Sequence, residues 1–121
     1  MRVLVVDDHP GVRQAAAQLL VALGFEALTA GDGGEAEEIL HDRDDVDLVM
    51  LDLFLGATRG AALATRLERQ RQGLRVLFMS GHSRDEMGTM PSLLGPRRRF
   101  IEKPFSLAAL GQAIDSLLNE S

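Results

Sequence analysis

The sequence predicts an α/β domain built on a parallel β-sheet with helices on both faces. Short apolar runs alternate with amphipathic stretches along all 121 residues, as expected of successive βα units. The apolar runs show no polar alternation, which indicates strands that are buried on both faces and therefore a parallel sheet. No linker, repeat or low-complexity tract interrupts the pattern, so we expect a single domain over residues 1–121.

The first half of the chain predicts two βα units. The apolar run Val3–Val6 is the first strand, and apolar residues at helical spacing follow over Pro10–Leu23. Gly24 is well placed to end that helix. The second strand is expected over Phe25–Ala30. The next segment, "DGGEAEEIL", opens with a cap aspartate and a glutamate three positions later, which predicts a second helix.

The second half repeats the alternation. "VDLVMLDL" (Val46–Leu53) is the third predicted strand, and a helix is expected over Gly60–Gln70. "LRVLFMS" (Leu74–Ser80) and "RFIEK" (Arg99–Lys103) are the fourth and fifth strands. Ser106 then caps a last helix.

The segment between the fourth and fifth strands predicts a weak helix. Ser83 and Glu86 form a capping-box signature for its start. Gly88 then costs about 1 kcal/mol relative to alanine in a helix interior, and Pro91 about 3 kcal/mol. We therefore expect a short, broken or mobile helix over residues 85–96.

Composition excludes several function classes. The chain has no cysteine, so it can form neither disulfides nor a thiolate metal site. The three histidines lack zinc-ligand spacing, and there is no P-loop or dinucleotide-binding glycine motif. A net charge of −5 argues against direct nucleic-acid binding. No apolar run approaches the ~20 residues of a membrane span, and no signal peptide is present, so we expect a cytoplasmic protein without membrane insertion.

Polar side chains stand where four of the predicted strands end. Asp7 and Asp8 follow the first strand, Asp52 ends the third, Ser80 the fourth and Lys103 the fifth. In an open parallel sheet, ligands bind beyond the carboxyl ends of the strands, so these side chains converge if their strands are neighbours. Three carboxylates together need a cation, and oxygen ligands suit Mg²⁺. A lysine and a hydroxyl beside them are the groups that hold a phosphoryl group.

Each of these residues alone has a plainer explanation. The aspartates could cap helices, the lysine could face solvent, and the serine could belong to a turn. Arg97–Arg99 is more typical of a solvated turn than of a binding patch. The occurrence of all the strand-end residues together favours a functional site.

Four stretches, "VLVVDD", "LVMLDL", "VLFMSG" and "FIEKPF", carry a family resemblance. In this order and at these spacings they resemble the receiver domain of two-component response regulators, over nearly the whole chain. The resemblance implies a flavodoxin-like (βα)5 fold with sheet order 2-1-3-4-5. It also implies a Mg²⁺-dependent phosphoacceptor switch, which is not an enzyme in the usual sense.

The same resemblance assigns the metal and the acceptor. Asp52 is the implied phosphoacceptor and a metal ligand. Asp8 is implied to bind Mg²⁺ directly and Asp7 mainly through water. The backbone carbonyl of Phe54 is the remaining implied ligand.

Further roles follow from the resemblance for the fourth and fifth strands. Ser80 is expected to hydrogen-bond the phosphoryl oxygens, and Lys103 to pair with Asp52 or its phosphoryl group. The bond before Pro104 is expected to be cis. Phe100 matches the family's switch aromatic, although plain core packing explains it equally well.

The loop after the acceptor, "LFLGATRG", departs from the family pattern. Leu55 and Gly56 stand where relatives usually carry a Met-Pro pair, whereas Gly60 matches the family glycine. We expect a more mobile loop, which bears on the rate of phosphotransfer and not on the identity of the acceptor. Ser80 replaces the commoner threonine but keeps the hydroxyl.

The resemblance implies a histidine kinase or a histidine phosphotransfer domain as partner. "VLFMSGHSRDE" and "GPRRRFIEKPF" resemble receivers of hybrid histidine kinases, which suggests a phosphorelay. No helix-turn-helix or DNA-reading helix follows the last predicted unit. Two alternatives stay open: a receiver-like interaction module that works without phosphorylation, and a small phosphatase, which would commonly carry a second aspartate at position 54, here Phe54.

Overall fold

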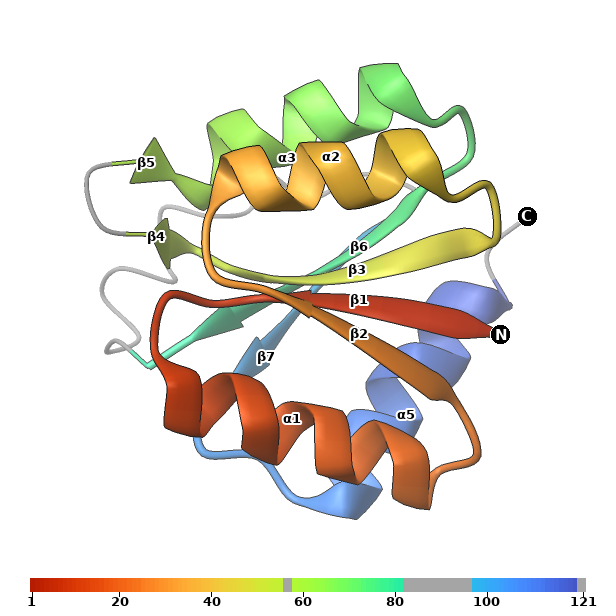
Figure 1. Cartoon of the computed structure of the whole chain (residues 1–121). Helices are drawn as coiled ribbons and strands as arrows, with labels where there is room; N and C mark the ends of the chain where they lie inside the picture. Colours follow the sequence, from red (N-terminus) through yellow and green to blue (C-terminus); the bar gives the residue numbers. More distant parts are fainter. Residues whose placement is uncertain (56–57, 82–96, 120–121) are drawn as a thin grey trace.

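The computed structural model describes residues 1–55, 58–81 and 97–119 (Figure 1). The helix predicted over residues 85–96 therefore lies outside the described residues. The elements within the described ranges follow in chain order: β1 (Arg2–Val6), α1 (Pro10–Ala22), β2 (Glu26–Ala30), α2 (Gly33–Asp42), β3 (Val46–Asp52), β4 (Phe54–Leu55), β5 (Thr58–Arg59), α3 (Gly60–Gln70), β6 (Arg75–Ser80), β7 (Arg98–Glu102) and α5 (Leu107–Leu118).

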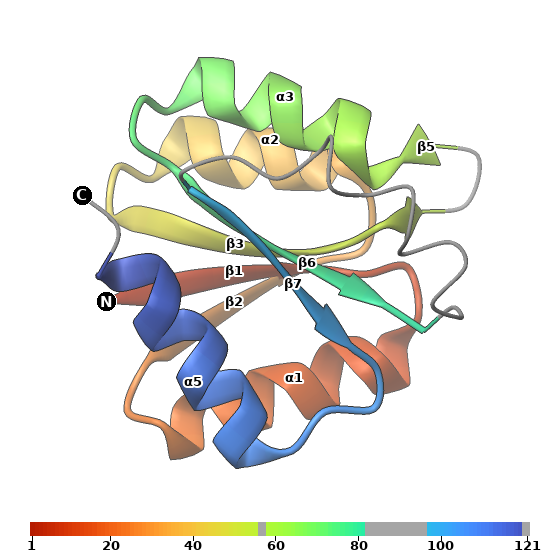
Figure 2. The ribbon, with the colours of Figure 1, turned by 180° about the vertical axis from the view of Figure 1, so that it is seen from behind.

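The main sheet is parallel and has the order β2-β1-β3-β6-β7. Because β6 and β7 are the fourth and fifth predicted strands, the expected order 2-1-3-4-5 is confirmed. The chain steps from β1 outward to β2 and then back across to β3, so the topology switches between β1 and β3. Figures 1 and 2 show α2 and α3 on one face of the sheet and α1 and α5 on the other.

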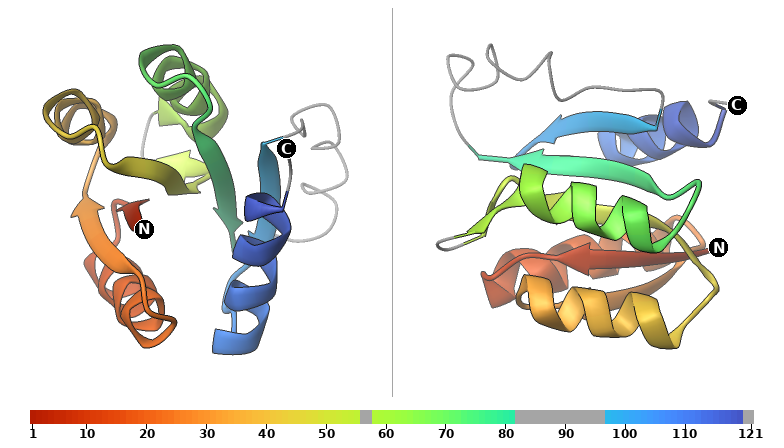
Figure 3. Two further views of the ribbon diagram at one scale, coloured as in Figure 1. Left: turned by 90° about the vertical axis from the view of Figure 1, so that its right-hand side faces the viewer. Right: turned by 90° about the horizontal axis from the view of Figure 1, so that it is seen from above.

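Two apolar clusters fill the spaces between the sheet and its helices. Leu4 and Val6 point to the side of α2 and α3, whereas Val3 and Val5 point to the side of α1 and α5. This alternation is the period of two that a strand imposes on its side chains. Since both faces are covered, as the two views of Figure 3 show, all four of these residues are apolar and buried.

Local signals in the sequence account for the helix boundaries. Gly24 has a φ of 94°, a conformation that glycine adopts readily, and the chain leaves α1 there. Asp32 caps α2 by accepting a hydrogen bond from the backbone N–H of Glu35, at 2.8 Å. Ser106 caps α5 in the same way, accepting from Ala109 N–H at 3.0 Å.

The segment after β3 differs from the expected loop. β4 and β5 form a two-stranded antiparallel pair that joins Phe54 to Arg59 and Leu55 to Thr58. Strands of two residues are too short for hydrophobic periodicity to reveal. The expectation of a more mobile loop stays a prediction, since residues 56–57 lie outside the described ranges.

Gly60 closes the base of this hairpin. Its N–H donates to the carbonyl of Leu53 at 2.8 Å. A β-carbon at Gly60 would lie 2.3 Å from the carbonyl oxygen of Asp52, which is closer than real β-carbons approach backbone atoms. Glycine is therefore required here by close packing against the end of β3.

None of the helices in the described ranges is long and apolar enough to cross a bilayer.

Candidate functional site

Three carboxylates gather at the edge of the sheet where β1 and β3 end. Asp7 and Asp8 directly follow β1, and Asp52 is the last residue of β3. One oxygen atom from each of the three lies within 4.8 Å of the others. The cluster stands at the switch in strand order, where open α/β sheets bind their ligands.

The three acids differ in burial. Asp7 is fully buried and Asp52 is 8% exposed, whereas Asp8 is exposed. A buried carboxylate is costly unless its oxygens are paired. Asp7 Oδ1 accepts a hydrogen bond from the backbone N–H of His9 at 2.9 Å, and Oδ2 accepts one from Lys103 Nζ at 2.7 Å. Asp7 thus has a local backbone partner and a charged partner, but it does not cap α1, whose N-cap residue is His9.

Lys103 reaches the acids from the segment that follows β7. Its backbone N–H donates to the carbonyl of Ser80 at 2.7 Å, which ties it to the end of β6. Its ammonium nitrogen lies 2.7 Å from Asp7 Oδ2 and 3.6 Å from Asp52 Oδ2. The peptide bond between Lys103 and Pro104 is cis. The structure thus brings this lysine to the acid cluster, as strand-end reasoning predicted.

Ser80 ends β6, the strand beside β3. It is 1% exposed and pairs in register with Glu102 of β7. The neighbouring backbone is tied as well, because Leu53 N–H donates to the carbonyl of Met79 at 2.9 Å. The strand ends that carry Asp52 and Ser80 are therefore adjacent.

Phe100 stands apart from the acid cluster. Its ring stacks on Phe78 with centroids 5.1 Å apart, and the pair belongs to the apolar layer under α2 and α3. The guanidinium carbon of Arg98 lies over the Phe78 ring, 5.7 Å from its centroid. Core packing is what the structure describes for Phe100, and its switch role stays a prediction.

The donor set fits a hard divalent cation. Three carboxylates face one ammonium, so the cluster carries excess negative charge. Carboxylate oxygens are the ligands that Mg²⁺ prefers, and Mg²⁺ is usually held by one or two of them with water in its other positions. Asp8 and Asp52 offer exposed or partly exposed oxygens for this purpose. Phe54, whose carbonyl is the further expected ligand, begins β4 directly after this edge.

An apolar groove opens beside the cluster, between α1 and the segment after β7. Its volume is about 440 Å³, and its lining consists of His9, Gly11, Val12, Ala15, Ala16, Leu19, Lys103, Pro104 and Phe105. Lys103 borders both the groove and the acids. A partner seated in the groove would therefore lie next to Asp52.

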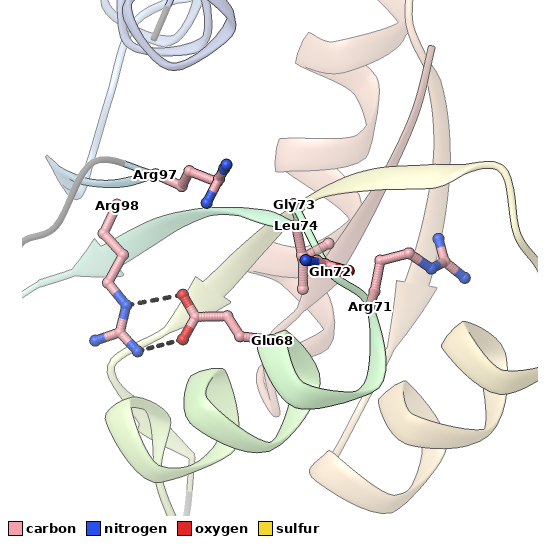
Figure 4. Close-up of a pocket in the computed structure, with 7 residues that line it drawn as sticks. All are labelled: Glu68, Arg71, Gln72, Gly73, Leu74, Arg97 and Arg98. Atoms are coloured by element: carbon pink, nitrogen blue, oxygen red, sulfur yellow. Dashed lines mark hydrogen bonds and ion pairs between the residues drawn. The ribbon is translucent and has the colours of Figure 1, made fainter. Parts of the chain in front are cut away.

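A second hollow of about 280 Å³ lies where β6 and β7 begin, at the opposite edge of the sheet from the acids (Figure 4). Two of its arginines, Arg71 and Arg98, are engaged within the protein. Glu68 accepts a hydrogen bond from Arg98 Nε at 3.0 Å, and this bond raises the pKa of Arg98 above its usual value. Arg71 donates to the carbonyl of Leu40 at 2.9 Å. These contacts give Arg71 and Arg98 a structural role.

Sequence reasoning missed two residues at the site. Arg13 donates to the backbone carbonyl of Asp7, and His9 is both the N-cap residue of α1 and part of the groove. A half-buried arginine one turn into a helix has no distinctive signal in the sequence. A contact to a backbone carbonyl becomes visible only in the folded chain.

Comparison with known proteins agrees with this geometry. Residues 3–115 match the family described as the response regulator receiver domain. The chain is 31% identical over 122 residues to the transcriptional regulatory protein GlrR of Escherichia coli (strain K12), covering 98% of this chain and 26% of GlrR. It is 28% identical over 120 residues to the sensor kinase CckA of Brucella abortus (strain 2308), covering 98% of this chain and 12% of CckA.

The solved structures include a receiver domain from the hybrid histidine kinase CckA. It superposes with a TM-score of 0.77 at 30% identity, covering 97% of this chain and 99% of that one. The chain thus spans a small part of the long proteins GlrR and CckA but the whole of an isolated receiver. With a family match over most of its length and the acid cluster in place, the chain belongs to the response regulator receiver domain family, a family of phosphoacceptor modules and not of enzymes.

Proposed function

We propose that this chain is a Mg²⁺-dependent phosphoacceptor switch in which Asp52 accepts a phosphoryl group from a phosphohistidine of a partner. The observation that carries the proposal is the position of Asp52. It ends the central strand, keeps a small exposed surface, and stands within reach of two further acids and of Lys103.

The acceptor step needs an oxygen nucleophile and charge stabilisation. A carboxylate oxygen of Asp52 attacks phosphorus in line, an O–P bond forms, and the P–N bond to the donor imidazole breaks. Lys103 Nζ, 3.6 Å from Asp52 Oδ2, is placed to stabilise the charge on the phosphoryl oxygens. Mg²⁺, when bound, supplies further neutralisation of these oxygens. Asp7, Asp8, Asp52 and the carbonyl of Phe54 are the residues that would hold it.

The response to phosphorylation is assigned to Ser80 and Phe100. Ser80 lies at the end of the strand beside β3, which supports a hydrogen bond from its hydroxyl to a phosphoryl oxygen on Asp52. Phe100 is on β7, two strands away from Asp52, and its ring already packs inward on Phe78. A shift of Ser80 toward the phosphoryl group would move the end of β6. The pairing of β6 with β7 would then transmit this movement to β7.

The phosphodonor is a histidine kinase or a histidine phosphotransfer domain. The apolar groove offers such a partner a surface bordered by Lys103, whose ammonium nitrogen lies 3.6 Å from Asp52 Oδ2. The likeness to the sensor kinase CckA supports a phosphorelay as the setting. The cytoplasmic location stays a prediction.

Intact-mass measurement with a small phosphodonor tests the proposal. The full chain is incubated with acetyl phosphate in the presence of Mg²⁺, and in parallel with a chelator. We expect one phosphoryl adduct with Mg²⁺ and far less without it. No adduct under either condition would contradict the proposal and would favour a receiver-like module that binds partners without phosphorylation.

A further inference from the structure

We propose that Arg13, one turn into α1, is a positioning residue for the metal site. It holds the peptide unit between Asp7 and Asp8 and thereby sets where the Asp8 carboxylate stands. This inference rests on the proposed function and deepens it, because it adds a residue that touches neither the phosphoryl group nor the metal.

The first observation is a hydrogen bond to the backbone. Arg13 Nη1 donates to the carbonyl oxygen of Asp7 at 2.8 Å, and that carbonyl belongs to the peptide unit whose nitrogen is that of Asp8. The backbone N–H of Arg13 also donates to the carbonyl of His9 at 3.0 Å. Through its main chain and its side chain, Arg13 therefore binds both ends of the loop between β1 and α1.

The second observation is that few other contacts restrain Asp8. Asp7 is anchored through its N–H to the carbonyl of Ala30 at 3.1 Å and through both carboxylate oxygens. Asp8 is exposed, and within the described ranges no hydrogen bond or ion pair holds its carboxylate. An exposed side chain without partners is placed by its backbone alone. The bond from Arg13 is thus the side-chain contact that restrains the peptide on which Asp8 depends.

The third observation is the space made for the guanidinium. A β-carbon at Gly31, in the segment between β2 and α2, would lie 3.0 Å from Arg13 Nη1. Gly31 does not have a positive φ, so its backbone permits alanine. An added methyl group would require the guanidinium to move by a few tenths of an ångström, and we expect this movement to disturb its bond to Asp7. The variant Gly31→Ala therefore disturbs Arg13 without removing any charge.

The hydrogen bond and the charge of Arg13 have opposite effects on Mg²⁺ affinity, so a binding measurement can distinguish them. A guanidinium near the acid cluster repels a cation, so loss of its charge alone would tighten Mg²⁺ binding. Loss of the hydrogen bond would free the Asp7–Asp8 peptide and weaken Mg²⁺ binding. A net hydrogen-bond contribution corresponds to between about twofold and tenfold in affinity.

The experiment is a titration of the metal-free full chain with Mg²⁺ alone, followed by calorimetry and by the Asp8 amide signal in NMR. The variants are Arg13→Ala, Arg13→Lys and Gly31→Ala. The matched control is Arg66→Ala, which removes an arginine from a helix surface where it pairs with Glu37 at 2.6 Å. Thermal unfolding of each variant shows whether an affinity change merely follows lost stability.

We expect Arg13→Ala to weaken Mg²⁺ binding by between about twofold and tenfold. Gly31→Ala should shift affinity in the same direction by less, Arg13→Lys should recover part of the loss, and Arg66→Ala should leave affinity unchanged. Unchanged or tighter binding in Arg13→Ala, or in Gly31→Ala should the first variant not fold, would overturn the role of Arg13. Wild-type protein that neither binds Mg²⁺ nor takes a phosphoryl group would instead overturn the proposed function.

Discussion

Lys103 lies closer to Asp7 than to Asp52: its ammonium nitrogen is 2.7 Å from Asp7 Oδ2 and 3.6 Å from Asp52 Oδ2. Asp7 is the fully buried acid of the cluster, and burial of an unpaired carboxylate is costly. Lys103 thus compensates the carboxylate whose burial is most costly, while remaining within reach of Asp52, the proposed acceptor. The adjacent aspartates at the end of β1 are tolerated because one is paired and the other faces solvent.

Replacing Lys103 with methionine should destabilise the protein by about 1–3 kcal/mol. Breaking a buried ion pair leaves its partner uncompensated and costs about 3–5 kcal/mol, but the lysine side chain is 18% exposed, which reduces the effect. Urea unfolding measures the change. In an Asp7→Asn background the same substitution should cost much less, whereas equal costs in both backgrounds would show that the pair is not coupled.

Replacing Asp8 with alanine should abolish Mg²⁺ binding and leave the metal-free fold as stable as wild type or more so. Removal of one negative charge relieves repulsion among the three acids. Differential scanning calorimetry in the presence of a chelator follows the melting temperature. Asp44→Ala, at an exposed acid far from the cluster, is the control. A lower melting temperature for Asp8→Ala than for wild type would refute the repulsion argument.

Replacing Gly60 with alanine should destabilise the protein by about 1–3 kcal/mol and slow phosphorylation. The added β-carbon would meet the backbone of Asp52 and Leu53, which cannot give way as a flexible side chain can. Gly34→Ala is the matched control, because its β-carbon would make only an ordinary contact, 3.5 Å from Asp32 Oδ1. Equal stability of the two variants would show that Gly60 is not constrained by packing.

Ser80 should transmit the effect of phosphorylation at Asp52 to β7, the strand that carries Phe100. With Ser80→Ala we expect Asp52 to be phosphorylated still, while the accompanying NMR shifts around Phe100 shrink, because the hydroxyl that would bond the phosphoryl group is gone. Ser80→Thr keeps the hydroxyl and should preserve those shifts. Full-sized shifts in the alanine variant would remove Ser80 from the signalling path.

The fold and most of the site could be predicted from the sequence because both depend on short-range patterns. Uninterrupted apolar runs such as Val3–Val6 indicate strands covered on both faces, and the strands of a parallel sheet end at one edge. Asp7, Asp52 and Lys103 meet there for that reason, although they are distant in the chain. Capping signals placed α2 and α5 correctly, through Asp32 and Ser106.

The remaining features depend on contacts that leave no local pattern. The β4–β5 hairpin has strands of two residues, and the stack of Phe100 on Phe78 follows from the register of two neighbouring strands. The contact from Arg13 to the Asp7 carbonyl joins α1 to the loop that follows β1. The weak helix expected over residues 85–96 stays a prediction, to be measured by amide exchange.

Mapping the modified residue tests the central claim most directly. The full chain is treated with acetyl phosphate and Mg²⁺ and then with borohydride, which reduces an aspartyl phosphate to homoserine and so marks the acceptor permanently. Cleavage after arginine yields a peptide over residues 44–59, whose fragment masses separate Asp52 from its other aspartates. We predict homoserine at position 52 alone, and none in Asp52→Asn; homoserine at another aspartate, or equal labelling of the Asp52→Asn variant, would contradict the assignment of Asp52 as the phosphoacceptor.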